Sequence, residues 1–205
     1  METIFLIAIL VMSVIIHEIS HGYVAYMLGD PTAKLAGRLT LNPVSHIDPL
    51  GSIIVPTLMA MSGTGVIFGW AKPVPYNPYN LKNQRWGTAL VGAAGAASNL
   101  LVAIIFGLII RFGDLIGIAG PFIEISVMIV LINILLAVFN LIPIPPLDGS
   151  KVLFSLLPYR FNYIQEFLER YWIFLIFFVI FFAWRIIMPI ISLLFSFITG
   201  MSPLF

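Results

Sequence analysis

The residues best suited to chemistry are His17, Glu18 and His21, which form the pattern His-Glu-x-x-His in the first apolar stretch. On a helix, residues four apart lie on one face about one turn apart, so two imidazoles at this spacing can hold one metal ion. Glu18 lies on an adjacent face, where its carboxylate can reach a metal-bound water. The pattern therefore predicts a helical zinc site, and the alternative is that the three side chains pair with other polar groups in the protein interior.

A catalytic zinc ion usually has three protein ligands and one open position for water. The sequence contains no cysteine, which leaves His46 or a carboxylate as the third ligand. Asp148 is the strongest candidate, because Pro143 and Pro145 stop a helix just before it while the chain is still apolar. Non-helical backbone at membrane depth needs a cavity. An ordinary Pro-Asp-Gly turn at the surface is the alternative interpretation.

The composition places these residues in a membrane protein. Of the 205 residues, 60% are hydrophobic and only 9% are charged, whereas a soluble domain has about 25% charged residues. We therefore expect a lipid bilayer around the chain. The net charge of +1 gives no electrostatic surface for nucleic acid, so no nucleic-acid partner is expected.

A transmembrane helix needs about 20 mostly apolar residues. Four stretches qualify, and they are Ile4–Leu28, Thr88–Ile110, Phe122–Ile142 and Tyr171–Ile198. The last is interrupted by Arg185 and Pro189, so one kinked helix and two shorter pieces are both open. Leu50–Trp70 is also apolar but rich in glycine, which favours a re-entrant segment.

These elements predict an all-α polytopic membrane protein of about four transmembrane helices with a re-entrant segment. A short β-hairpin is an option, because Val66–Pro75 combines apolar β-formers with prolines that restrict a strand to an edge. We expect a single domain over residues 1–205. Its catalytic core would cover about residues 1–155, and a C-terminal membrane segment about residues 171–198.

The zinc hypothesis constrains the topology. For His17, His21 and Asp148 to meet, the first and third clear spans must run in the same direction, so Leu50–Trp70 should not cross. Eight of the ten basic residues then lie on one side, which the positive-inside rule assigns to the cytoplasm. These eight are Lys34, Arg38, Lys72, Lys82, Arg85, Lys151, Arg160 and Arg170. The N-terminus is therefore expected outside.

Four motifs follow one another along residues 1–155. They are His17-Glu18-x-x-His21, Asn42-Pro43-Val44-Ser45-His46-Ile47-Asp48-Pro49, Gly95-Ala96-Ala97-Ser98-Asn99 and Asn140…Pro143…Leu147-Asp148-Gly149. In this combination the chain resembles the site-2 protease family of intramembrane zinc metalloproteases, and within it the compact prokaryotic branch.

The resemblance implies one Zn2+ per chain, held by His17, His21 and Asp148, with Glu18 as general base. It also implies that Asn140 helps to bind or polarise the substrate backbone. Gly95 is best explained by close packing of helices through small residues.

His46, Asp48 and Asn99 could act behind the ligands or in gating. For His46 and Asp48, occasional zinc ligation and a surface turn between two prolines are the alternatives. The family places Asn99 in the core helix beside the site.

The function implied by the family is hydrolysis of peptide bonds within or near transmembrane segments of membrane-protein substrates. The location implied is the prokaryotic inner membrane, with the active site open towards the cytoplasm. A zinc transporter or sensor and a catalytically silent homologue that retains substrates are the alternatives.

Overall fold

The computed structural model describes residues 2–61, 69–118, 120–179, 182 and 184–202. Within these ranges the chain is helical or irregular and contains no strand, which confirms the expected all-helical class. The α-helices are α1 (Glu2–Met27), α2 (Thr32–Leu35), α3 (Val55–Met61), α4 (Gln84–Phe112), α5 (Pro121–Asn140), α6 (Asp148–Leu156), α7 (Asn162–Phe178) and α8 (Trp184–Thr199).

Three of these helices, α1, α4 and α5, are long and apolar enough to cross a membrane. Asn83 caps α4 by accepting a hydrogen bond from the Trp86 amide at 3.0 Å. Pro121 stands in the first turn of α5, where its missing N–H costs no hydrogen bond. Exposed apolar side chains such as Ile4 and Leu101 cover the outer faces, as expected for an integral membrane protein.

Within the predicted fourth span over Tyr171–Ile198, the structure describes two α-helices. Most of the described residues there belong to α7 and α8, which have 17 and 16 residues. The first half of α7 is polar, with residues such as Glu166 and Glu169, so only its second half is apolar. Helix α8 contains Pro189 and packs against α4 and α5 through buried residues including Phe195.

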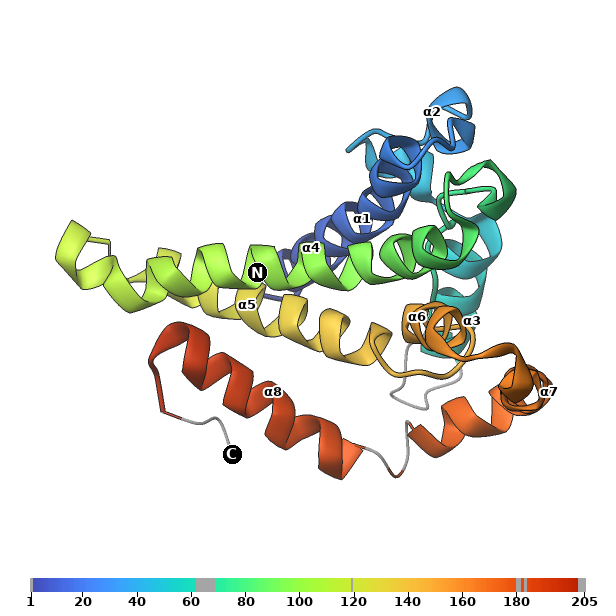
Figure 1. The fold of residues 1–205 in the computed structure, drawn as a ribbon. Coiled ribbons are helices and arrows are strands. Elements are labelled where there is room, and N and C mark those ends of the chain that lie inside the picture. The colour runs from blue at the N-terminus through green and yellow to red at the C-terminus, as the bar shows by residue number, and fades with distance from the viewer. Residues whose placement is uncertain (1, 62–68, 119, 180–181, 183, 203–205) are drawn as a thin grey trace.

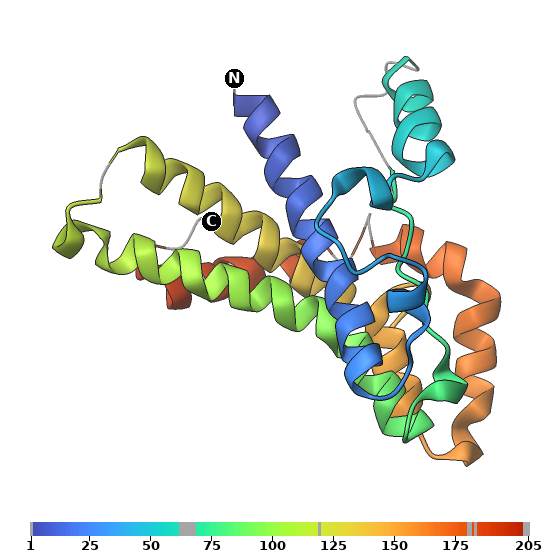
Figure 2. The same cartoon turned by 90° about the horizontal axis from the view of Figure 1, so that it is seen from above.

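The long helices α1, α4 and α5 pack against one another. Helices α4 and α5 lie side by side in opposite directions, and α1 crosses them (Figure 1). The view from above shows the C-terminal half of α1 beside the beginning of α4, and α6 near both (Figure 2). The buried positions of α4 are mostly Gly and Ala, which lets neighbouring helices approach its backbone closely.

The turn between α5 and α6 places Asp148 at the first residue of α6. Residues 141–147 leave the helical path and return towards α4. A Cβ atom at position 149 would lie 2.2 Å from the carbonyl oxygen of Leu141, so glycine is required there. The prolines and Gly149 together therefore direct Asp148 inward.

The segment after residue 68 is extended but is not part of a sheet. The amide of Trp70 donates to the carbonyl of Gly51 at 3.1 Å, and that of Lys72 donates to the carbonyl of His46 at 2.9 Å. These partners belong to helical turns at Pro43–His46 and Pro49–Ile54, so no ladder forms. The optional β-hairpin is absent from the described residues, and residues 66–68 of the expected strand lie outside them.

Asp30 anchors the far end of this segment. Its buried carboxylate accepts hydrogen bonds from the Asn77 amide at 2.6 Å and from the Asn80 side chain at 2.8 Å. Burial opposes the charge, but these donors and Thr32 hold the pKa of the Asp30 carboxyl below its usual value. The extended segment is thereby fixed against the C-terminal end of α1.

Candidate metal centre

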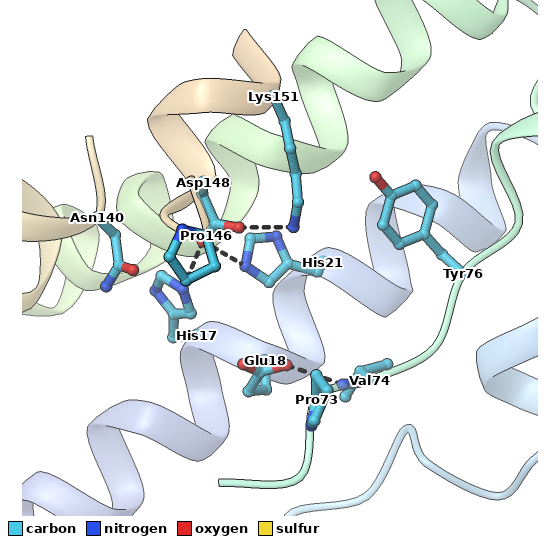
Figure 3. Close-up of a pocket in the computed structure, with 10 residues that line it drawn as sticks. All are labelled: His17, Glu18, His21, Pro73, Val74, Tyr76, Asn140, Pro146, Asp148 and Lys151. Carbon is cyan, nitrogen blue, oxygen red and sulfur yellow. Dashed lines mark hydrogen bonds and ion pairs between the residues drawn. The ribbon is translucent and has the colours of Figure 1, made fainter. Parts of the chain in front are cut away.

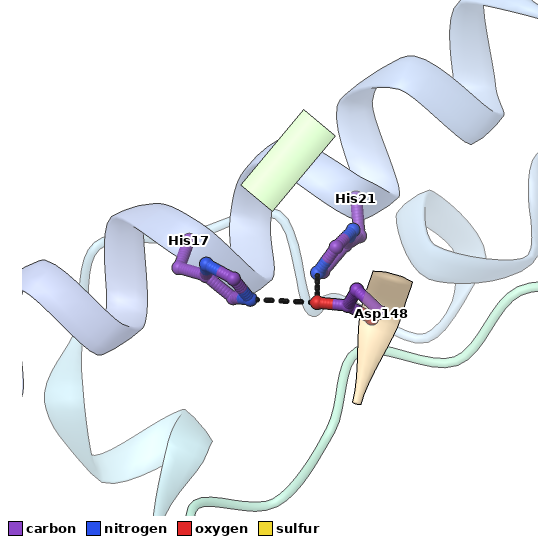
Figure 4. Close-up of side chains that lie close together, drawn as sticks. All are labelled: His17, His21 and Asp148. Atoms are coloured by element: carbon purple, nitrogen blue, oxygen red, sulfur yellow. Dashed lines mark hydrogen bonds and ion pairs between the residues drawn. The ribbon is translucent and has the colours of Figure 1, made fainter. Parts of the chain in front are cut away.

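His17 and His21 lie on the same face of α1 and are both buried, with 6% and 5% of their surface exposed. Their rings meet edge to face, with centroids 4.7 Å apart. Asp148 reaches them from the start of α6 (Figure 4). One oxygen, Oδ2, lies 2.9 Å from Nε2 of His17 and 3.0 Å from Nε2 of His21.

This donor set fits a zinc ion. The ligand atoms of His17, His21 and Asp148 all lie within 4.8 Å of one another. With zinc–ligand bonds of about 2.0–2.2 Å, ligand atoms of a tetrahedral site lie about 3.3–3.6 Å apart. Oδ2 of Asp148 lies 2.9 Å and 3.0 Å from the two imidazole nitrogens, a few tenths of an ångström closer than this, so a small outward movement of the carboxylate admits the ion.

The second nitrogen of each imidazole is held by an oxygen atom. Nδ1 of His17 lies 2.7 Å from Oδ1 of Asn99, and Nδ1 of His21 lies 2.6 Å from the carbonyl oxygen of Val91. Because a carbonyl oxygen can only accept, the proton belongs on Nδ1 in both rings. Both Nε2 atoms are thereby directed towards the metal position, which is how proteins orient histidine ligands of zinc.

A buried polar network stands behind His17. The side-chain Nδ2 of Asn99 donates to Oδ1 of Asn133 at 2.7 Å, and Nδ2 of Asn133 donates to Oγ of Ser13 at 2.9 Å. These bonds connect α4, α5 and α1 and set the orientation of the Asn99 amide. Sequence reasoning missed Asn133 and Ser13, although polar residues within apolar spans are a signal that could have found them.

Gly95 provides the space for both imidazoles. A Cβ atom at this position would lie 2.5 Å from Nε2 of His17 and 2.6 Å from Nε2 of His21. The sequence interpretation of Gly95 was close packing between helices. The contact is more specific than that, because the atoms packed on Gly95 are the metal-facing nitrogens themselves.

Glu18 faces a cavity of about 170 Å³ beside the cluster (Figure 3). Its Oε2 atom accepts a hydrogen bond from the amide of Val74 at 2.8 Å. The lining residues are His17, Glu18, His21, Pro73, Val74, Tyr76, Asn140, Pro146, Asp148 and Lys151. The predicted base and the three predicted ligands therefore border one cavity, which the extended segment partly covers.

Lys151 pairs with the oxygen of Asp148 that faces away from the imidazoles. Its Nζ atom donates to Oδ1 at 2.8 Å. Burial opposes the charge of Asp148, and the Lys151 ammonium beside it stabilises the carboxylate. Burial also disfavours the ammonium, yet Asp148 raises the pKa of Lys151. Both groups are therefore charged at neutral pH.

The other predicted residues lie at different distances from the cluster. Asn140 lines the cavity and donates from Nδ2 to the carbonyl of Leu136 at 2.9 Å. His46 donates from Nε2 to the carbonyl of Thr40 at 2.8 Å, and Asp48 accepts from the amide of Gly51 at 2.7 Å. The last two residues shape the turns that hold the extended segment, and neither lines the cavity.

A buried His-His-Asp group with an adjacent glutamate is typical of the active site of a zinc-dependent hydrolase, and here it lies in a helical membrane protein. Comparison with known proteins identifies the class further. The profile of peptidase family M50 matches residues 113–183. YwhC of Bacillus subtilis is 40% identical over 161 residues, which are 75% of this chain and 69% of YwhC. The chain belongs to peptidase family M50, the site-2 protease family of membrane zinc metalloproteases.

More distant relatives share less of their length. Rip2 of Mycolicibacterium smegmatis is 32% identical over 148 residues, which are 69% of this chain and 53% of Rip2. The zinc metalloprotease MJ0392 of Methanocaldococcus jannaschii is 26% identical over 161 residues, which are 78% of this chain and 37% of that protein. No solved structure gives a significant match.

Proposed function

We propose that this protein hydrolyses peptide bonds within or near transmembrane segments of membrane-protein substrates. His17, His21 and Asp148 would hold one zinc ion, and Glu18 would act as general base. The observation that carries the proposal is the convergence of three buried ligand atoms within 4.8 Å, beside a cavity that Glu18 also lines. The names of the relatives, zinc metalloprotease among them, support the same chemistry.

When bound, zinc supplies a water with a pKa lowered towards about 7 and polarises the peptide carbonyl. Glu18 accepts a proton from the attacking water and later donates it to the leaving amine. The Val74 amide donates to Oε2 of Glu18, so the second oxygen is the one oriented for this proton transfer. Asn140 also lines the cavity, and we assign it the contact with the substrate backbone.

The proposed topology has the N-terminus outside and the catalytic cavity open to the cytoplasm of a prokaryotic cell. We assign the apolar stretch Leu50–Trp70 as a re-entrant segment, because its many glycines disfavour a continuous spanning helix. Helices α1 and α5 then run in the same direction. The eight basic residues named above share the cytoplasmic side under this arrangement.

A helical substrate must present an extended stretch before its carbonyl can be attacked. The segment from Trp70 to Val74 is itself extended beside Glu18. Its alternate amides donate to the neighbouring turns, at Trp70 and Lys72, and to the Glu18 carboxylate, at Val74. We assign it the role of edge at which the unwound substrate docks. His46 and Asp48 support this segment through the turns they form, and this is the gating role that we assign to them.

The test compares Glu18→Gln with His17→Ala in the purified full-length protein. Glu18→Gln should keep zinc and lose cleavage of a single-span test substrate, whereas His17→Ala should lose both. Glu124→Gln, on the exposed start of α5, is the matched control and should behave as wild type.

Zinc content, chelator sensitivity and cleavage in detergent are the three measurements. Cleavage that persists in Glu18→Gln would refute the assigned base. Wild-type protein that binds zinc but cleaves no membrane substrate would favour a transporter, a sensor or a silent homologue.

A further inference from the structure

Lys151 occupies a position in the cavity that the mechanism above does not use. It stands one turn after Asp148 on α6, and its ammonium lies between Asp148 and the ring of Tyr76 (Figure 3). Nζ is 2.8 Å from Oδ1 of Asp148 and 5.6 Å from the centroid of the Tyr76 ring. Because Oδ2 of the same carboxylate faces both imidazoles, the Asp148 carboxylate lies directly between the ammonium and the metal position.

The ammonium has hydrogen-bonding capacity to spare. A lysine ammonium carries three N–H donors. Among the described residues, Asp148 is the hydrogen-bond acceptor found for Lys151. The side chain is 34% exposed and lines the cavity that Glu18 lines as well. The remaining donors are therefore available to a molecule bound there.

Peptide hydrolysis needs a donor of this kind. As water adds to the carbonyl carbon, a C–O bond forms, a water proton passes to Glu18, and the carbonyl π electrons move to the carbonyl oxygen. Donors aimed at that oxygen lower the barrier, and they are most effective in a site that excludes water. When the carbonyl reforms, the C–N bond breaks and the amine receives the proton from Glu18.

We propose that Lys151 is a further catalytic residue, which donates a hydrogen bond from Nζ to the scissile carbonyl oxygen as that oxygen becomes negative. Lys151 keeps its protons throughout the reaction. This inference rests on the proposed proteolytic function and adds a second source of positive charge, on the same side of the cavity as Asp148.

The packing of α6 on α4 supports a fixed position for Lys151. A Cβ atom on Gly92 would lie 2.9 Å from Cβ of Lys151 and 3.2 Å from the carbonyl oxygen of Asp148. Glycine at this position lets the start of α6 approach the α4 backbone. The base of the lysine side chain is thus held on the same surface that receives the two imidazoles at Gly95.

The alternative is that Lys151 only positions Asp148, and three measurements separate the two roles. Lys151→Met removes the charge and the donors at similar length, and Lys151→Arg retains them. Lys34→Met is the matched control, because Lys34 also pairs with a tyrosine but does so on the exposed surface of α2. The first measurement is zinc affinity, by chelator competition. The second is kcat and KM on a single-span substrate. The third is affinity for a phosphinic peptide, which mimics the tetrahedral carbon.

For Lys151→Met we expect a fall in kcat of about 10²–10³-fold with KM nearly unchanged. Phosphinic-peptide affinity should fall in parallel, zinc affinity should stay close to wild type, and Lys151→Arg should recover part of kcat. Wild-type kcat in Lys151→Met, or a loss of activity that excess zinc restores, would overturn the proposal while leaving the proteolytic function intact. A wild-type protein without proteolysis would instead overturn both.

Discussion

Replacing Gly95 by alanine tests whether α4 sets the position of the two imidazoles. The added Cβ would lie 2.4 Å from Cε1 of His17 and 2.6 Å from Nε2 of His21. Ordinary contacts between such atoms are about 3.5–4.0 Å, so each ring would have to retreat by about 1 Å. Neither ring can do so freely, because Asn99 and Val91 hold their Nδ1 atoms at 2.7 Å and 2.6 Å.

The expected size of the effect follows from these contacts. Overpacking in a tight interior costs about 1–3 kcal/mol, and alanine in place of glycine within a helix returns about 1 kcal/mol. The net loss of folding stability for Gly95→Ala should therefore be about 0–2 kcal/mol. The displacement of the two histidine ligands should reduce zinc affinity more strongly than folding stability. We expect zinc affinity to fall at least as much as on loss of a residue that orients a ligand, about 10–100-fold.

Gly107→Ala provides the matched control on the same helix. A Cβ atom there would lie 2.2 Å from Cγ2 of Ile198 on α8, far along α4 from the metal centre. This variant should lose a similar amount of stability and keep wild-type zinc affinity. Both proteins are compared by chelator competition and by thermal unfolding with and without zinc.

The result that would refute the reasoning is wild-type zinc affinity in Gly95→Ala. It would mean that the imidazoles can move away from α4 without leaving the metal position. Equal losses of zinc affinity in Gly95→Ala and Gly107→Ala would also contradict it, because a general loosening of the helices would then explain both.

Two further predictions concern buried polar groups. Asn133→Leu removes the acceptor that orients the Asn99 amide, so zinc affinity should fall about tenfold by chelator competition. Ser126→Ala on the same helix, where the hydroxyl donates to the carbonyl of Phe122 within α5, should leave that affinity unchanged. The folded-state pKa of Asp30 lies below the unfolded value of about 3.9. Its stabilising effect is therefore complete above about pH 4 and lost as pH falls through the lower folded value. Thermal unfolding between pH 3 and pH 7 should show this loss in wild type, and Asp30→Asn should be less stable at neutral pH with a weaker dependence; equal slopes would contradict it.

Local sequence patterns predicted the parts of the site that depend on spacing within one helix. The four-residue spacing of His17 and His21 places both rings on one face wherever the helix lies. The prolines before Asp148 predicted the end of α5, and the structure brings Asp148 to the two histidines from a distance of more than 120 residues along the chain. The family assignment, made from these motifs, is confirmed by the similarity to YwhC.

The structures of the C-terminal region and of the extended segment depend on packing between elements, which the spacing of residues within one segment does not predict. Over Tyr171–Ile198, apolar composition alone suited either one kinked helix or two. The polar start of α7 and the packing of α8 on α4 and α5 favour two. Val66–Pro75 has the composition of a strand, but the described part of it finds helical turns as partners, so its amides bond singly without a ladder.

The polar network behind His17 explains why the site needs three helices and not two. Ser13, Asn99 and Asn133 each look like an isolated polar residue in an apolar helix. Each would be costly in a membrane alone, and together they satisfy one another through bonds of 2.7 and 2.9 Å. The network ends on Nδ1 of His17 at 2.7 Å. The same contacts that make α1, α4 and α5 pack in one register therefore also fix the nitrogen that faces the metal, so helix packing and ligand orientation cannot be changed independently.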